Sequence, residues 1–185
     1  MRKLIYSMGV SLDGFIAGPD GSIDWSAPDE ELHRFRNQQT REIGAQLCGR
    51  RLYEAMVYWE TAEEDPSAPE HVLEFARIWK ELPKVVFSKT LEKVEGNASL
   101  ARDGVAEEVA RLKERPGKDL AVGGAGLASA CTELGLIDEY RMFVSPVLLG
   151  GGTPYFPALD GRINLELVET RTFGSRVVYV RYGRA

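Results

Sequence analysis

A short apolar run that ends in glycines constrains this chain more than any other stretch. Residues 120–122 (LAV) have the length and character of a strand buried on both faces. Residues 123–126 (GGAG) follow directly, and residues 127–134 predict a helix. A helix N-terminus presents backbone N–H groups that favour negative charge, and glycines let a ligand approach the main chain. The pattern indicates either an anion-binding junction or a plain tight turn between strand and helix.

A second junction of the same kind lies earlier in the chain. Residues 44–48 predict a short strand that ends at Gly49, and residues 50–58 predict a helix that begins with two arginines. The carboxyl ends of parallel strands meet at one edge of a sheet, where open α/β sheets bind their ligands. We therefore expect both junctions to face a ligand at the same edge.

The remaining periodicity predicts an α/β fold in one domain, residues 1–185. Strand and helix patterns alternate up to the C-terminal hairpin, so we expect a mainly parallel central sheet, helices on both faces and an antiparallel end. A glycine-rich loop over residues 11–21 follows the first strand and has the length of a functional lid. The other predicted elements are a strand at 3–10, a helix from a cap at Ser26 or Asp29 to about Ile43, a helix at 71–82, strands at 84–88 and 94–100, a helix at 105–114, a strand at 138–147, and a hairpin of 165–170 with 176–182.

Composition excludes several classes of function. The chain has 185 residues and a net charge of −5 without a basic run, which argues against nucleic acid as a partner. No apolar run approaches the roughly 20 residues that span a bilayer, and the N-terminus lacks a signal-peptide pattern. We therefore expect a cytoplasmic protein with no membrane partner. Cys48 and Cys131 lie in apolar surroundings and predict buried thiols, and neither His33 nor His71 has a metal-ligand neighbour.

Several motifs occur together in a specific order. SLDGFIA follows the first strand, a tryptophan ends the loop, GRRLYEAM follows the second strand and FSKT the third, and VGGAG and GGGTPYFP come later. This order resembles the dihydrofolate reductase-like fold. It is most similar to the stand-alone relatives of the reductase domain of bifunctional riboflavin-biosynthesis enzymes, over about residues 3–182.

The resemblance implies NADPH as the cofactor. It implies that Gly49 and Arg50, with Arg51 beside them, receive the pyrophosphate, although a solvated helix start is the alternative. The family often has a threonine where this chain has Leu52, which removes a hydroxyl from the phosphate loop. The loop after the third strand is implied to bind the 2′-phosphate through Ser88, Lys89 and Thr90. The other implied cofactor contacts are Ala17, Val122, Gly123, Gly124, Ala125, Gly126 and Leu127.

The glycine pair has two possible geometries. In the family it has an unusual backbone, commonly a cis peptide, beside the nicotinamide. A non-proline cis bond costs about 3 kcal/mol, so a trans turn at Gly123 and Gly124 is the alternative.

The implied catalytic residues lie on the lid. Asp13 is expected beside the nicotinamide, with a local turn before Gly14 as the alternative reading. Trp25 is expected at the end of the lid, with core packing as its alternative. The acidic residue that holds a pterin ring in folate reductases corresponds to one of Asp29, Glu30 and Glu31, which also suit a helix N-terminus simply by their charge.

The resemblance therefore implies a reductase of a small heterocyclic substrate, similar to 5-amino-6-(5-phosphoribosylamino)uracil reductase. Dihydrofolate reduction and a non-catalytic nucleotide- or ligand-binding role are the alternatives. A phosphorylated riboflavin precursor would need additional basic residues near the substrate. Relatives are commonly homodimers, so we expect a homodimer that covers the C-terminal sheet edge.

Overall fold

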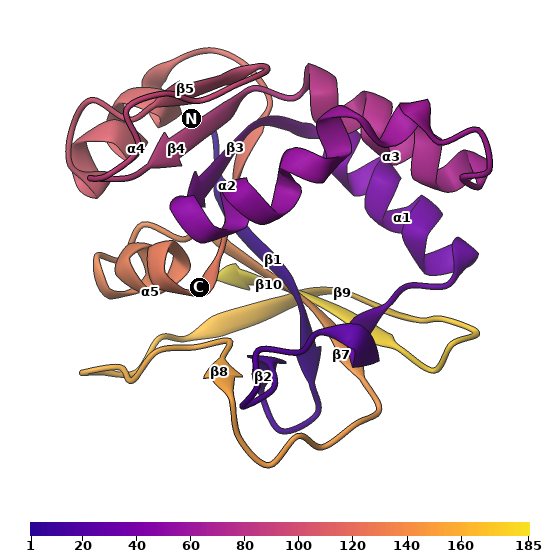
Figure 1. Cartoon of the computed structure of the whole chain (residues 1–185). Coiled ribbons are helices and arrows are strands. Elements are labelled where there is room, and N and C mark those ends of the chain that lie inside the picture. Colours follow the sequence, from indigo (N-terminus) through magenta and orange to yellow (C-terminus); the bar gives the residue numbers. More distant parts are fainter.

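A computed structural model describes the whole chain, residues 1–185, and shows one eight-stranded sheet (Figure 1). Its strands are β1 (Leu4–Ser11), β3 (Ile43–Gly49), β4 (Lys84–Phe87), β5 (Ala98–Leu100), β6 (Asp119–Gly123), β7 (Glu139–Ser145), β9 (Leu165–Thr172) and β10 (Val178–Arg184). Their order across the sheet is β5-β4-β3-β6-β1-β7-β10-β9. Pairing is parallel from β5 to β7, whereas β10 is antiparallel to both β7 and β9. The predicted mainly parallel sheet with an antiparallel C-terminal hairpin is confirmed.

Helices cover both faces of this sheet, as predicted. They are α1 (Glu30–Arg41), α2 (Arg50–Met56), α3 (Glu70–Glu81), α4 (Val105–Glu114) and α5 (Ala125–Glu133). Figure 1 shows α4 and α5 on the opposite side of the sheet from α1 and α3. Asp29, rather than Ser26, caps α1, because its carboxylate accepts a hydrogen bond from Leu32 N at 2.9 Å. None of these helices combines the length and the apolar character needed to cross a membrane.

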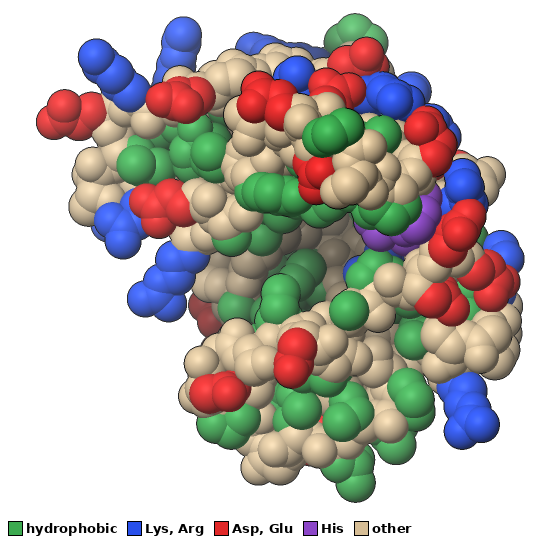
Figure 2. Space-filling model, turned by 45° about the vertical axis from the view of Figure 1, so that its right-hand side comes forward, with side chains coloured by type: hydrophobic (Ala, Val, Ile, Leu, Met, Phe, Trp, Pro, Cys, Tyr) green, Lys and Arg blue, Asp and Glu red, His purple; other side chains and the backbone are tan.

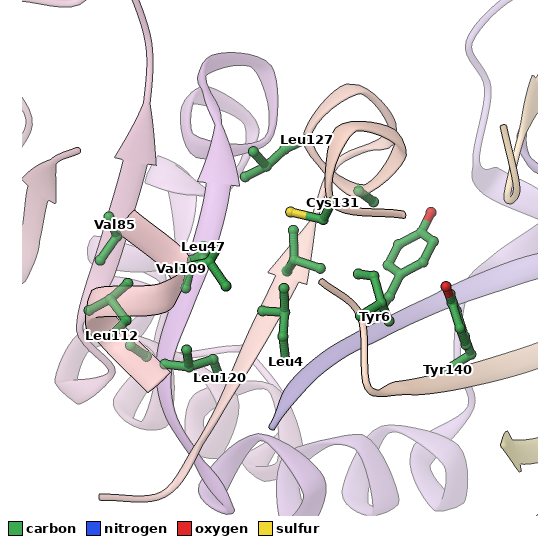
Figure 3. Packing of buried hydrophobic residues seen from close by; sticks show 14 of the residues in the cluster. Leu4, Tyr6, Leu47, Val85, Val109, Leu112, Leu120, Leu127, Cys131 and Tyr140 are labelled. Carbon is green, nitrogen blue, oxygen red and sulfur yellow. The ribbon is translucent and has the colours of Figure 1, made fainter. Parts of the chain in front are cut away.

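The main core lies between the sheet and the pair α4 and α5 (Figure 3). Successive strand residues point to opposite faces, so Leu4 and Tyr6 of β1 face the same side. They pack with Leu47, Leu120 and Val85 of the neighbouring strands and with α4 and α5, which contribute Val109, Leu112, Leu127 and Cys131. Both cysteines are buried and unpaired. A smaller cluster under α1 joins Leu32, Phe143, Phe173, Val177 and Tyr179.

Several element boundaries differ from the prediction. Helix α1 ends at Arg41, and Ile43 begins β3 instead of ending the helix. The helix predicted at 50–58 is α-helical only to Met56 and continues as a 3₁₀ turn, Val57–Glu60. The weak strand predicted at 94–100 is reduced to β5, because Gly96 has a φ of +66° that breaks the extended backbone.

The lid loop carries a strand that its polar sequence does not reveal. Residues Phe15–Ala17 form β2, which pairs antiparallel with β8 (Thr153–Pro154) in the second glycine-rich loop. Ile16 is buried in the main core with 8% of its surface exposed. One apolar side chain therefore anchors this loop to the core, which its polar, glycine-rich sequence does not predict.

The glycine pair has the trans geometry. No peptide bond in the chain is cis, so the implied cis bond between Gly123 and Gly124 is absent. Gly124 instead turns the chain with a φ of +87°, a conformation that favours glycine.

Candidate functional site

The predicted ligand-facing junctions lie side by side at one edge of the sheet. Strands β3 and β6 are parallel neighbours, with Cys48 paired to Gly123, and β4 follows on the other side of β3, with Gly49 paired to Phe87. The residues after all three strands therefore meet at the same edge, as their sequence predicts.

The junction before α5 has the geometry of an anion site. Gly124 is the N-cap of this nine-residue helix, no side chain caps it, and its first turn has no acidic residue. A Cβ added to Gly126 would meet no atom within 4 Å. Backbone N–H groups and open space are therefore both available there. The resemblance also implies cofactor contacts at Val122 and Leu127. Because both side chains belong to the main core, these two residues could contact a ligand only through main-chain atoms.

Basic residues lie at the start of α2, after Gly49, and in the loop after β4. Arg50 donates from Nη1 to Thr90 Oγ1 at 3.1 Å, which links the start of α2 to the loop after β4. Ser88 Oγ accepts hydrogen bonds from the backbone N of Thr90 and Leu91, at 3.2 and 3.0 Å. This turn orients the loop and presents the exposed Lys89.

Arg51 and Lys89 are the uncommitted charges of this edge. Both are exposed, and neither has a carboxylate within 4.0 Å. The N-cap Gly49 also has open space, since a Cβ there would meet nothing within 4 Å.

Asp13 lies outside the cleft and connects two loops. Its carboxylate accepts hydrogen bonds from Ser11 Oγ at 2.6 Å, Gly150 N at 2.7 Å and Leu149 N at 3.1 Å. The bond from Ser11, with those from the backbone, lowers the pKa of Asp13. This geometry holds the lid against the second glycine-rich loop and does not suit a proton donor.

Ala17 and Trp25 also lie on the lid. Ala17 pairs with Thr153, and its carbonyl oxygen lies only 2.0 Å from where a Cβ of Gly152 would be. Trp25 donates from Nε1 to Ser22 O at 3.1 Å and lines a separate, more open hollow with Gly18 and Leu149. Neither residue lines the main cleft.

The main cleft has a volume of about 370 Å³ and lies on the face of the sheet covered by α1. Figure 2 shows a hollow across the middle of this face, with hydrophobic side chains in its wall. Small residues that point to this face of β1 and β6 leave the room for it, namely Ser7, Gly9, Ala121 and Gly123. Gly123 belongs to the cleft and to the glycine junction, so the two sites are continuous.

Leu52 of α2 lies over Gly123, at the point where the glycine junction meets the cleft. A Cβ added to Gly123 would lie 2.6 Å from Leu52 Cδ2, so the leucine side chain covers this glycine. Leu52 also lines the cleft. The residue that replaces the family's usual threonine therefore contributes to the apolar cleft wall.

The cleft contains cations and no carboxylate. Its lining includes Arg36, Gln39 and Thr40 of α1, Gln46 of β3 and Arg141 of β7, but no aspartate or glutamate. Arg141 forms an ion pair with Glu139, with 2.7 Å between Nε and Oε1, and Glu139 also pairs with Arg181 at 2.8 Å.

The three acidic residues that could correspond to the pterin-binding residue of folate reductases have other partners in the protein. Asp29 caps α1, Glu30 pairs with Arg34 at 2.9 Å, and Glu31 accepts a hydrogen bond from Gly174 N at 3.1 Å.

Sequence reasoning missed Arg36, although a signal for it exists. Arg36 follows the buried Leu32 by four residues and therefore lies on the same face of α1. Burial lowers the pKa of the guanidinium to about 10, which leaves it charged at neutral pH.

Comparison with known proteins identifies the family of this chain. The model of the RibD C-terminal domain matches residues 2–179. The protein belongs to the RibD C-terminal domain family. A relative in this family, the uncharacterized protein YyaP of Bacillus subtilis (strain 168), is 39% identical over 184 residues, which cover 98% of this chain and 94% of YyaP.

Solved structures of related RibD C-terminal and dihydrofolate reductase-like proteins share the fold. A candidate riboflavin biosynthesis protein of Shewanella sp. PV-4 superimposes with a TM-score of 0.78 at 22% identity, covering 100% of this chain and 99% of that one. The deaminase/5-amino-6-(5-phosphoribosylamino)uracil reductase of Thermotoga maritima gives 0.70 at 17% identity, covering 100% of this chain and 57% of that one. Enterococcus faecalis dihydrofolate reductase, complexed with NADP(H), gives 0.63 at 17% identity, covering 98% and 96%. The fold is dihydrofolate reductase-like.

Proposed function

We propose that this protein is an NADPH-dependent reductase of a small heterocyclic substrate. The observation that carries the proposal is the position of Gly123, which ends β6 at the glycine junction and also lines the main cleft. A dinucleotide whose pyrophosphate lies at the junction would place its nicotinamide at the mouth of the cleft. The family and the reductases among its structural neighbours support an oxidoreductase.

The residues at the sheet edge fit a dinucleotide. Open space beside Gly49 and Gly126 leaves room for a pyrophosphate against the main chain. Lys89, held out by the turn at Ser88, would bind the 2′-phosphate, and a charge-assisted bond there favours NADPH over NADH. NADPH supplies a hydride when bound, while the protein orients the reactants and excludes water.

The cleft favours a riboflavin-type substrate over a folate. A pterin ring presents N–H donors that a carboxylate would bind, and no carboxylate lines this cleft. The cleft instead contains the basic residues that a phosphorylated pyrimidine requires. We therefore propose a substrate similar to 5-amino-6-(5-phosphoribosylamino)uracil, which the Thermotoga maritima neighbour's name includes.

The test combines cofactor titration with a turnover screen. The protein is titrated with NADPH and NADH, and loss of reduced nicotinamide is then followed with ribosylamino-pyrimidines and with dihydrofolate. The proposal expects NADPH to bind more tightly and a pyrimidine to be reduced. Tight NADPH binding without turnover of any heterocycle would favour a non-catalytic binding protein. Absence of NADPH binding would contradict the proposal.

A further inference from the structure

We propose that Arg36 binds an oxyanion of the ligand inside the main cleft, and so selects an anionic substrate. The inference rests on the proposed function, because that function makes the cleft the substrate site. It is carried by the contacts of Arg36, which is the charged side chain of the lining that has no carboxylate partner.

The fold directs the Arg36 guanidinium toward the floor of the cleft. Its Cζ lies 4.4 Å from the centre of the Phe143 ring, which fixes the plane of the group. Its Nη2 lies 3.3 Å from where a Cβ of Gly9 would be, so the glycine leaves room for the guanidinium. Ser26 Cβ approaches the same point to 3.5 Å. These neighbours position the charge and offer it no negative partner.

The guanidinium has no acceptor within the protein. Nε is buried without a hydrogen-bond partner, and Arg36 forms no ion pair with any aspartate or glutamate. The carboxylates nearest in sequence, Glu30 and Glu31, are committed to Arg34 and to Arg171 with Gly174 N. Arg36 is partly exposed to the cleft, but its Nε is buried, and a buried donor without a partner is costly and rarely retained without a use.

Most other polar side chains of the lining already have partners within the protein. Gln39 Nε2 donates to Tyr179 OH at 2.7 Å, and Thr40 Oγ1 donates to the carbonyl of Arg36 at 2.9 Å. Arg141 pairs with Glu139 at 2.7 Å. Arg36 is therefore the charged side chain of the cleft without a carboxylate partner, and it lies in an otherwise largely apolar site where an added anion would be bound strongly.

The chemistry of the guanidinium defines the group it would bind. It carries five N–H donors in a planar fork and no acceptor, which matches the paired oxygens of a carboxylate or a phosphate. A neutral amide edge would leave the charge uncompensated. The group that Arg36 would bind is therefore an oxyanion, either a carboxylate or a phosphate. The probes below distinguish the two.

The test uses two pyrimidines that differ in one carboxylate, orotate and uracil, together with inorganic phosphate. Each is titrated by calorimetry into the full-length protein, into Arg36→Gln and into Arg34→Gln. Arg34 is an exposed arginine on the same helix that pairs with Glu30, so its variant matches the charge change outside the cleft.

For the parent and Arg34→Gln we expect orotate to bind at least about tenfold more tightly than uracil, as for a charge-assisted pair. This preference should largely disappear in Arg36→Gln. If phosphate rather than orotate shows the dependence on Arg36, the oxyanion is a phosphate and the proposal stands. If neither anion binds the parent, or if both bind Arg36→Gln and the parent equally, the proposal is overturned.

Three further measurements separate this inference from misfolding and from the proposed function. Arg36→Lys retains the charge without the fork and should recover part of the orotate affinity. Thermal melts with and without orotate should show a ligand-induced shift for the parent and none for Arg36→Gln. NADPH titrations run in parallel should give equal affinity for the parent and Arg36→Gln. A parent protein that does not bind NADPH would contradict the proposed reductase. A parent that binds NADPH, but whose anion binding is the same as that of Arg36→Gln, would contradict only the anion inference.

Discussion

Leu52 lies directly over Gly123, with only 2.6 Å between its Cδ2 and the position that a Cβ at residue 123 would occupy. Gln46 Nε2 lies 3.1 Å from the same position. A Cβ at residue 123 would therefore displace the ends of the Leu52 and Gln46 side chains before any ligand is considered. Leu52 also lines the cleft, so this contact joins α2 to the floor of the proposed active site.

A double-mutant cycle tests this contact. Gly123→Ala should lower the free energy of unfolding by about 1–3 kcal/mol, because the added methyl overpacks against Leu52. Leu52→Ala should relieve the clash, so we expect a coupling energy of about 0.5–3 kcal/mol between the two changes. Chemical denaturation of the four proteins measures it. Strictly additive effects would show that Leu52 does not restrict residue 123.

Lys89 provides a test of cofactor choice. Lys89→Ala should weaken NADPH binding by about 1–3 kcal/mol, as expected when a charge-assisted hydrogen bond to the 2′-phosphate is lost, and should leave NADH binding nearly unchanged. Lys93→Ala is the matched control, since Lys93 is exposed in the same connection. Equal losses for both cofactors would remove Lys89 from the 2′-phosphate site.

Much of the fold follows from local sequence patterns, because each pattern has a direct physical consequence. The apolar run before Gly123 predicts a buried strand and the run before Gly49 predicts its neighbour, and the structure pairs them. Ile43 was misassigned because its apolar character fits the end of a helix as well as the start of a strand. Ile16 was missed because a single anchoring side chain in a polar loop leaves no periodic signal.

The site was less predictable than the fold. Asp13 has the residue type of a catalytic acid, but its carboxylate accepts one hydrogen bond from Ser11 in its own loop and others from Leu149 N and Gly150 N in a distant loop. These contacts depend on tertiary structure. The sequence did not indicate Arg36, because an arginine next to a helical apolar stripe normally extends into solvent. Only the absence of a partner around its side chain distinguishes it.

Glu139 should make stability depend on pH in acid. Burial opposes its ionisation, but hydrogen bonds from Arg181 and Arg141 outweigh burial and lower its pKa below the ordinary 4.5. A carboxylate with a lowered pKa stabilises the fold above the unfolded-state value, and this contribution is lost as the pH falls through the folded-state value. We therefore expect unfolding stability to decline below about pH 4.5.

The variant Glu139→Gln tests this prediction. It should lose about 3 kcal/mol of stability at neutral pH, because Arg141 would keep a buried charge without its partner, and it should lack this part of the acid dependence. Urea denaturation across acid and neutral pH measures both effects, with the exposed Glu133→Gln as control. A Glu139→Gln protein as stable as the parent at neutral pH would contradict the assigned network.

The exposed edge strand β9 predicts self-association. Its outer residues Leu167 and Val168 are 57% and 55% exposed, and its outer edge has no partner strand in the sheet. Such an edge is normally covered, so we propose a twofold homodimer through this region. Light scattering at micromolar concentration should give a dimer for the parent and a smaller mass for Val168→Lys. A monomeric parent would rule out the proposed dimer.

The central claim is that a dinucleotide lies against the glycine junction, and Gly126 offers the sharpest test of it. Gly124 is unsuitable, because its φ of +87° strains any side chain whether or not a ligand binds. Gly126 lies in the first turn of α5 with nothing within 4 Å of an added Cβ. Gly126→Ala should therefore fold at least as well as the parent, since alanine favours a helix by up to about 1 kcal/mol.

The decisive measurement is an NADPH titration of the parent, of Gly126→Ala and of Gly161→Ala, a control glycine whose added Cβ also meets nothing. If the dinucleotide lies against this junction, Gly126→Ala should melt no lower than the parent. It should also bind NADPH at least about tenfold more weakly, because its methyl group occupies the ligand's space. Gly161→Ala should bind NADPH like the parent. A folded Gly126→Ala protein with unchanged NADPH affinity would contradict the account.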